Sequence, residues 1–445
     1  MNTPILDFLR AYQAGDSSRF HMPGHKGRGP LGCEGMDITE IAGADVLSHA
    51  DGIIAESEAN TTRLFGTAHS FFSTEGSTLA IRAMLAIAAT PEKGKRPLIV
   101  AGRNAHRAFM SAAALLDLRV AWLNGKEDEH LCRATITKED VAAALAANAD
   151  AVAVYLTSPD YLGNTADIAG IAEVCHAAGV PLLVDNAHGA YLSFLEKSRH
   201  PIALGADMCA DSAHKTLPVL TGGAYLHIAK TAPADYVARA RASLALFAST
   251  SPSYLILASL DAANAALAGD YPAHIATAAT RLAGIRAEAE ARGFVAVGDE
   301  PLKLTLDGTA LGYTGGALAD CLRASKIECE YADDRYLVLM ASADNSEADF
   351  ARLSHALAAL PARPPITLAP PPARGEREAV LSIRDAMLAR AERIATERAL
   401  GRIAATPTVS CPPAVPILVS GERVDASAIA LLRYYGSEEL AVVCE

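Results

Sequence analysis

From about residue 97 the sequence alternates short apolar segments with helical ones, and this alternation constrains the fold more than any other feature. Helical stretches such as 141–147 and 168–178 separate the apolar segments. Segments with the length and composition of strands are 98–101, 151–157, 181–185, 208–212 and 224–228. Strands that alternate with helices predict a mostly parallel sheet sandwiched by helices, which is an α/β fold.

Polar and ionisable side chains lie at the ends of four of these predicted strands. In an open α/β sheet, ligands bind beyond the carboxyl ends of the strands. The side chains in these positions are Arg103, Asn104 and His106, then Asp160 and Tyr161, then Asp185 and His188, and then Ser212, His214 and Lys215. A single histidine is more often structural than catalytic, but four such strand ends favour one shared site.

Two of these residues, Asp185 and Lys215, lie about thirty residues apart, each at a strand end. Taken singly, each has an ordinary structural explanation. Together they are typical of a site for pyridoxal 5′-phosphate (PLP), in which the lysine holds the cofactor as a Schiff base. The aspartate pairs with the pyridinium nitrogen and keeps it protonated, so that the ring accepts electrons.

The segment Gly76-Ser77-Thr78 opens an apolar helix predicted over 79–89. Backbone N–H groups, two hydroxyls and the positive end of the helix dipole would form a phosphate-binding cup there. Serine and threonine are also ordinary helix caps, so this signal alone is weak. The sequence contains no GxGxxG and no GxxxxGK[ST], which argues against a dinucleotide or a P-loop nucleotide.

Residues 21–27, HMPGHKG, cannot form a regular element because Pro23 and Gly24 interrupt it. The segment is either an exposed basic loop or a loop that delivers His25 and Lys26 to an active site. The sequence leaves both interpretations open.

The composition excludes several functional classes. The formal net charge of −12 argues against nucleic acid as a partner. No apolar run reaches about 18 residues, and the N-terminus has no apolar signal core. We therefore expect no membrane span and a cytoplasmic protein. The eight cysteines show no CxxC spacing, so neither a metal site nor a disulfide framework is expected.

The pattern further predicts five parts of the chain. They are an N-terminal arm with the HMPGHKG loop (1–30), a large cofactor-binding domain (31–245), a small α+β domain (246–360), a proline-rich linker (361–375) and a C-terminal subdomain (376–445). Within the last part, residues 376–401 have the charge pattern of a long amphipathic helix.

Several motifs, in this order, resemble those of the PLP-dependent ornithine/lysine/arginine decarboxylases of bacteria, in the short form without an extra N-terminal regulatory domain. The motifs are HMPGHKG, FFSTEGST, RNAHRAF, TSPDYLGNTADI, VDNAHGAYLSF, GADMCADSAHKTLPVLTGGAYLH, STSPSYLILASLD, GRIAA and CPPAVPILVSGE. The resemblance implies a fold similar to aspartate aminotransferase (fold type I). It also implies an assembly of at least two subunits with active sites at their interface, and α-decarboxylation of lysine, ornithine or arginine to CO2 and a polyamine-type amine.

The resemblance also implies a role for individual residues. Lys215 would bond to the cofactor, Asp185 would contact the pyridine nitrogen and His106 would stack on the ring. His188 would lie beside the cofactor. Residues implied to bind the phosphate or the ring edge are Gly76, Ser77, Thr78, Ser212 and His214.

Substrate contacts are expected from His25, Lys26, Tyr161 and Glu422. Glu422 would bind the distal amine or guanidinium of a basic substrate. The alternative interpretation is that Glu422 is an ordinary surface glutamate in a turn.

The chain departs from the family pattern mainly on the substrate side. The usual DEAHGAH reads DNAHGAY, with Asn186 and Tyr191 in place of Glu and His, and the usual RNCHKS reads RNAHRAF. The usual PYPPGIP…PGE reads CPPAVP…SGE, with changes at Cys411, Ala414 and Ser420. Another PLP reaction, by an aminotransferase, aldolase or lyase, is therefore one alternative, and a non-catalytic relative that serves as a partner or regulator is a second.

Overall fold

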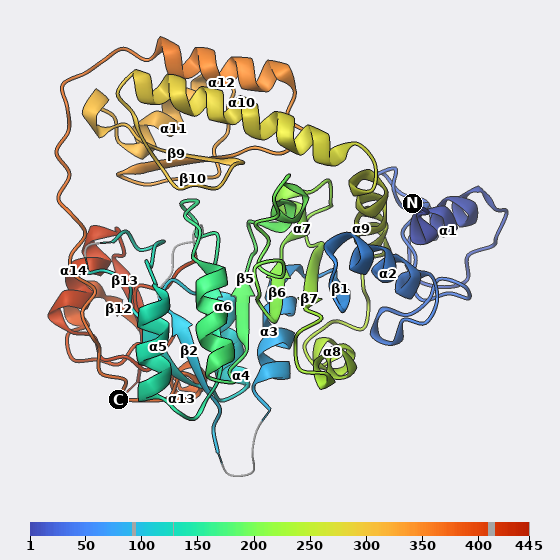
Figure 1. Ribbon diagram of the computed structural model, residues 1–445, viewed down its shortest axis with the longest axis horizontal. Helices are drawn as coiled ribbons and strands as arrows, with labels where there is room; N and C mark the ends of the chain where they lie inside the picture. The colour runs from blue at the N-terminus through green and yellow to red at the C-terminus, as the bar shows by residue number, and fades with distance from the viewer. Residues whose placement is uncertain (91–94, 128, 408–413, 445) are drawn as a thin grey trace. The chain divides into compact units, whose positions relative to one another are not determined.

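The computed structural model describes residues 1–90, 95–127, 129–407 and 414–444 (Figure 1). The chain divides into two compact units. The first comprises Met1–Thr90 and Ile168–Ile275, and the second comprises Pro91–Asp167 and Ala276–Glu445. The five parts predicted from the sequence remain predictions.

The large sheet is mostly parallel and has seven strands, which confirms the predicted α/β fold. In the first unit the order is β1-β7-β6-β5, formed by His69–Ser73, Ala224–Ile228, Met208–Asp211 and Leu182–Asp185. In the second unit it is β4-β2-β3, formed by Ala151–Thr157, Leu98–Gly102 and Arg119–Leu123. The pairs β5–β6, β2–β4 and β2–β3 are parallel, whereas β7 runs antiparallel to β1 and β6. All five predicted strands are present, but β1 and β3 were not predicted.

Some helices of the first unit contact its strands, and others contact neighbouring helices. In chain order they are α1 (Pro4–Ala14), η1 (Leu47–His49), α2 (Ile53–Phe65), α3 (Gly76–Ala88), α6 (Ile168–Ala177), η2 (Ala190–Phe194), α7 (Ala213–Thr216), α8 (Asp235–Ala245) and α9 (Tyr254–Leu267). Of these, α2, α3, α6 and α7 contact the strands, whereas α1, α8 and α9 contact other helices. Helix α3 contacts β6, β7 and α8 and buries most of its side chains, as its apolar sequence predicts. Asp261 on α9 accepts hydrogen bonds from the backbone N–H groups of Ile5 and Leu6, and so fastens the start of α1.

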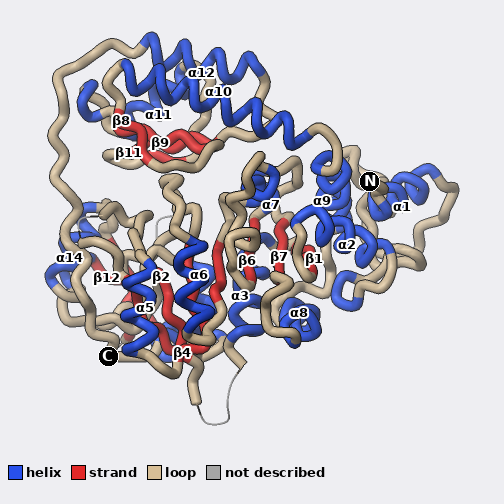
Figure 2. Tube along the Cα trace, in the orientation of Figure 1, coloured by secondary structure: helices blue, strands red, loops and turns tan. Residues whose placement is uncertain are grey.

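The second unit contains a four-stranded antiparallel sheet of order β10-β11-β9-β8 (Tyr331–Ala332, Tyr336–Met340, Lys303–Asp307 and Val295–Val297). Helices α10 (Tyr271–Ala291), α11 (Gly315–Ala324) and α12 (Glu347–Ala359) lie on one side of it (Figures 1 and 2). The remaining elements of this unit are α4 (Arg107–Leu115), α5 (Lys138–Ala147), η3 (Thr309–Leu311), α13 (Ile383–Leu388), β12 (Ala391–Ala395), η4 (Thr396–Arg398), α14 (Ala426–Tyr434) and β13 (Glu439–Val443).

The long helix predicted over 376–401 is wrong. This stretch contains the six-residue α13, the strand β12 and the short η4. Strand β12 pairs antiparallel with β13, in a register that places Ile394 opposite Leu440, and Ile394 packs against a buried apolar cluster. Pairing with a strand more than forty residues away outweighs the local helical pattern here.

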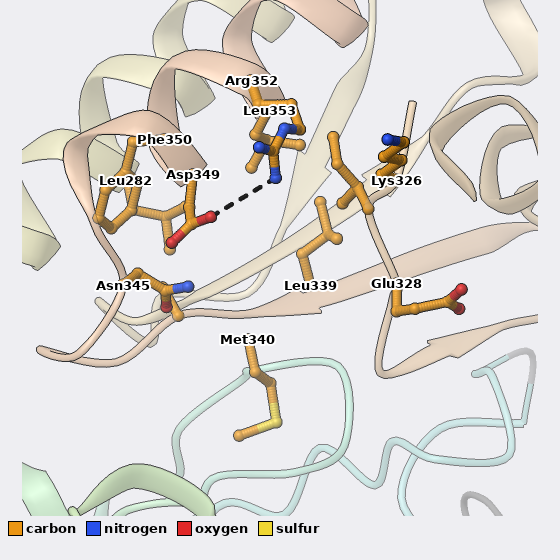
Figure 3. A pocket seen from close by; sticks show the side chains of 12 residues that line it. Leu282, Lys326, Glu328, Leu339, Met340, Asn345, Asp349, Phe350, Arg352 and Leu353 are labelled. Carbon is orange, nitrogen blue, oxygen red and sulfur yellow. Dashed lines mark ion pairs between the residues drawn. The ribbon is translucent and has the colours of Figure 1, made fainter. Parts of the chain in front are cut away.

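A pocket of about 190 Å³ lies beside the small sheet, between β11 and α12 (Figure 3). Its lining includes Leu339, Met340 and Phe350, and an ion pair of 3.7 Å joins Asp349 to Arg352. None of the residues that the sequence singles out lines this pocket. Across the described residues, no helix combines the length and the apolar character needed to cross a bilayer.

Candidate functional site

Lys215 lies in the one-turn helix α7, directly after β6. The sequence predicted a strand end at this point, and the structure adds the helical turn, in which the N–H of Lys215 donates to the carbonyl of Ser212. The ammonium of Lys215 lies 2.9 Å from Nε2 of His188. The predicted lysine therefore faces a second predicted site residue.

His188 belongs to a tight turn, residues 185–189, that follows β5. Asp185 is the last residue of β5, is 2% exposed and accepts a hydrogen bond from the N–H of Ala187. Because β5 and β6 are parallel neighbours, their carboxyl ends meet at the same edge of the sheet. The turn with Asp185 and His188 is thereby placed beside the segment that carries Lys215.

The start of α3 forms the third part of this region. Gly76 has φ +69°, a conformation that favours glycine, and its N–H donates to the carbonyl of Gly222 at 2.7 Å. The hydroxyl of Ser212 donates to that of Ser77 at 2.8 Å. Thr78 follows in the first turn of this helix, where backbone N–H groups have no partner within the helix. Hydroxyls from two segments thus meet at a helix N-terminus, an arrangement that suits a phosphate.

His214, the neighbour of Lys215 in α7, is fixed by a hydrogen bond. Its Nδ1 lies 3.0 Å from the carbonyl oxygen of Gly223, which can only accept, so Nδ1 carries the hydrogen. Burial lowers the pKa of His214, which keeps the ring neutral at neutral pH. Its Nε2 is therefore an acceptor.

Three predicted site residues, His106, Tyr161 and Glu422, lie in the second unit. Their positions relative to Lys215 remain predictions. His106 caps α4, where its Nδ1 accepts from the N–H of Ala108. The hydroxyl of Tyr161 donates to Glu330 at 2.6 Å, and its ring stacks edge-on against Tyr331. Nearby, burial raises the pKa of Asp160 to about 6.

Glu422 is buried, so the alternative of a surface glutamate in a turn is wrong. Its two carboxylate oxygens lie 3.2 and 3.0 Å from the guanidinium of Arg103, and it also accepts from the N–H of Val419. Arg103 in addition donates to the carbonyls of Pro416 and Ile417. This ion pair holds the segment around 416–422 to the end of β2. A contact between Glu422 and the substrate remains a prediction.

We expect Glu422→Ala to lower the free energy of unfolding by about 3–5 kcal/mol, because it leaves the guanidinium of Arg103 buried without its carboxylate. Urea unfolding followed by circular dichroism measures the change. Glu378→Ala is the matched control, since its partner Arg423 and Glu378 itself are exposed. Removing that exposed pair should cost less than about 1 kcal/mol. Equal losses in the two variants would contradict a structural role for the buried pair.

The side chains of His25 and Lys26 in the HMPGHKG loop contact residues that are near them in the sequence. His25 lies 3.1 Å from the carboxylate of Asp37, and its Nδ1 accepts from the N–H of Gly27. The ammonium of Lys26 donates to the carbonyl of His21. Delivery of His25 and Lys26 to an active site stays a prediction.

The structure describes four of the residues that depart from the family pattern. Tyr191 is fully buried in η2, and the amide of Asn186 donates to Asp211. The carbonyl of Ala414 accepts from the N–H of Arg107 at the start of α4, and Ser420 is buried. Cys411 lies outside the described residues.

Comparison with known proteins identifies the family of this chain. The sequence model of the family described as "Orn/Lys/Arg decarboxylase, major domain" matches residues 3–289, and that of the C-terminal domain matches 375–440. The chain belongs to the Orn/Lys/Arg decarboxylase family. An amino-acid decarboxylase is an enzyme of the carboxy-lyase type, and the resemblance predicted from the motifs is thereby confirmed.

Relatives and solved structures support this membership. An arginine decarboxylase of Halalkalibacterium halodurans is 31% identical over 97% of this chain and 93% of its own length. The uncharacterized protein YaaO of Bacillus subtilis is 29% identical over 97% of this chain and 94% of its own. The constitutive lysine decarboxylase of E. coli has a TM-score of 0.79 at 18% identity, with 100% of this chain and 82% of the other covered. At that identity the structural match shows the shared fold.

Proposed function

We propose that this decarboxylase uses PLP and removes the α-carboxyl group of lysine, ornithine or arginine, with CO2 and the corresponding amine as products. The observation that supports it most is the contact of 2.9 Å between Lys215 and His188, beside the turn that begins with Asp185. Arginine is the first substrate to test, because two relatives matched over 93% of their own length carry the name arginine decarboxylase.

The donor set of the first unit fits PLP. It offers an amine for the aldehyde, a buried carboxylate for the ring nitrogen, and two hydroxyls at a helix N-terminus for the phosphate. Bound PLP supplies a protonated ring that accepts the electron pair left behind when CO2 departs. All of these groups lie at the same edge of one sheet, which favours a single binding site over unrelated surface groups.

The residues of the chain then have separate tasks. Asp185 is buried, and a carboxylate there would attract a protonated ring nitrogen more strongly than it would in water. Ser77 and Ser212, together with Gly76 and Thr78, bind the phosphate and so orient the ring. Orientation of this kind accounts for a large part of catalysis when the reacting bond must be aligned.

Lys215 and His188 would handle the proton. A hydrogen bond of 2.9 Å allows Nε2 of His188 to take a proton from the ammonium, which leaves a nucleophilic amine. After the carboxyl group is lost, the same pair can return a proton to the α-carbon. We further propose that His106 covers the ring and that Tyr161 and Glu422 lie towards the substrate.

We also propose a homodimer or a larger homo-oligomer with sites at its interface, as the family resemblance implies. Light scattering on the purified protein tests it. A cytoplasmic location is proposed because all described cysteines are free thiols, which suits a reducing compartment.

The decisive experiment incubates the PLP-loaded protein with arginine, lysine, ornithine and neutral amino acids, and identifies the products by mass spectrometry. CO2 and an amine from one basic amino acid are the expected result. A keto acid would instead indicate an aminotransferase. Bound cofactor without any product from the basic amino acids would indicate altered chemistry, and no cofactor binding would favour a non-catalytic relative.

A further inference from the structure

A fully buried polar cluster, formed by Asp211, His200, His227 and Cys209, lies behind the candidate site. Nε2 of His200 and Nε2 of His227 lie 2.9 and 3.3 Å from the same carboxylate oxygen of Asp211. The thiol of Cys209 donates to the other oxygen at 3.5 Å. All four residues are 0% exposed. Buried charges of this kind are costly unless they are paired, so such a cluster calls for a functional or structural reason.

The strand register brings these residues together. Strands β6 and β7 pair antiparallel with Cys209 opposite His227 and Asp211 opposite Tyr225. Since side chains alternate along a strand, these positions share one face of the sheet. On the neighbouring β1, Ser70 lies opposite His227, and its hydroxyl is 2.7 Å from Nδ1 of that histidine. His227 is thus hydrogen-bonded at Nδ1, and its Nε2 faces the carboxylate of Asp211 at 3.3 Å.

The two imidazoles keep Asp211 ionised. Burial alone would raise the pKa of Asp211, but its interactions with His200 and His227 outweigh burial and hold that pKa far below its usual range. A fixed carboxylate is therefore present at neutral pH, with two of its contacts made by imidazole rings.

A further contact of Asp211 reaches the candidate site. The amide of Asn186 donates to Asp211 at 2.7 Å, and the N–H of Asn186 donates to the carbonyl of Ala210 at 3.0 Å. Asn186 is the second residue of the turn that carries Asp185 and His188. The N–H of Gly189 donates to the carbonyl of Asn186 and so completes the turn. Gly189 also packs closely against this amide, since a Cβ at Gly189 would lie 2.1 Å from the side-chain oxygen of Asn186. The inner side of the turn is thus fastened to β6.

We propose that Asp211 is a positioning residue for the cofactor site: held by His200 and His227, it fixes Asn186 and thereby orients Asp185 and His188. The proposal rests on the proposed function. It also accounts for one departure from the family pattern, since Asn186 replaces the usual glutamate and Asp211 provides a buried carboxylate from the adjacent strand. Asp211 touches neither substrate nor cofactor in this scheme, and it acts through Asn186.

Two single variants separate positioning from simple stability. Asn186→Ala removes the link but leaves the pairs of Asp211 with both histidines, and Asp211→Asn removes the charge. The control is Asp261→Asn, which alters another buried aspartate of the same unit that accepts from Ile5 and Leu6. For each variant we would measure the dissociation constant of PLP, the absorbance spectrum of the bound pyridoxal group and the melting temperature.

We expect Asn186→Ala and Asp211→Asn to raise the dissociation constant of PLP about ten- to a hundredfold and to change the spectrum, since each loses a hydrogen bond to a charged group. Asp261→Asn should lower the melting temperature and leave both cofactor measurements unchanged. The exchange variant Asn186→Asp/Asp211→Asn restores one carboxylate and one amide, and should recover most of the affinity.

Other results would overturn the proposal. If the wild type binds PLP and both single variants bind it within twofold of wild type, positioning by Asp211 is excluded while the proposed function stands. A wild type without affinity for PLP would refute the proposed function and this proposal with it. One equivalent of a transition metal in the purified protein would also overturn it, because His200, Cys209 and Asp211 would then be metal ligands.

Discussion

Replacing Lys215 by alanine should reduce kcat for decarboxylation by at least about a thousandfold, because covalent and proton-transfer steps each contribute factors of this order. The variant loses the amine that bonds to the cofactor and the group that faces His188 at 2.9 Å. Release of CO2 from the best basic amino acid measures the rate. The absorbance spectrum should at the same time lose the band of the covalently bound pyridoxal group.

Lys230→Ala is the matched control for this prediction. Lys230 is an exposed lysine that follows β7 in the same unit, and its removal should leave the rate within twofold of wild type. Activity of Lys215→Ala within tenfold of wild type would show that another amine holds the cofactor, and the assignment of Lys215 would then be wrong.

Asp185→Ala should lower kcat/KM by about a hundred- to a thousandfold, the range found when one preorganised charge or dipole at a reacting centre is removed. Without the buried carboxylate, the ring nitrogen loses the partner that keeps it protonated, and the electron pair left by CO2 is less stabilised. Steady-state rates at several substrate concentrations measure the ratio. Asp185→Asn should give a loss of similar size, because the amide keeps the shape and removes the charge.

The control is Asp235→Asn, which changes an exposed aspartate at the start of α8. We expect its kcat/KM to equal that of wild type. Turnover of Asp185→Ala close to the wild-type value would eliminate the electron-sink scheme, even if the cofactor were still bound.

The parts of the fold that the sequence predicted are those with strong local signals. Strands β2, β4, β5, β6 and β7 are apolar segments bounded by turns, and their buried positions match that pattern. Strand β3 was not predicted, and in the structure it begins with the exposed Arg119 and is mostly half-exposed. Strand β1 was missed because its apolar residues continue almost directly into α3.

Contacts between distant residues explain the remaining errors. Glu422 and Arg103 are 319 positions apart, and only folding shows that they form a buried ion pair. The helix expected over 376–401 failed for a similar reason, since β12 gains hydrogen bonds from β13 that no local window contains. Local propensity is a weak preference that tertiary pairing overrides.

The sequence by itself determined the α/β class, the family and the residues that the family motifs carry, because strand and helix periodicity and motif order are local properties of the chain. The tertiary structure alone decided which of these residues meet. It placed Lys215 against His188, joined Ser212 to Ser77, and built the cluster around Asp211 from residues to which the motifs assign no role. The physical reason is that strand register and parallel pairing set side-chain proximity, and register depends on the packing of the whole sheet.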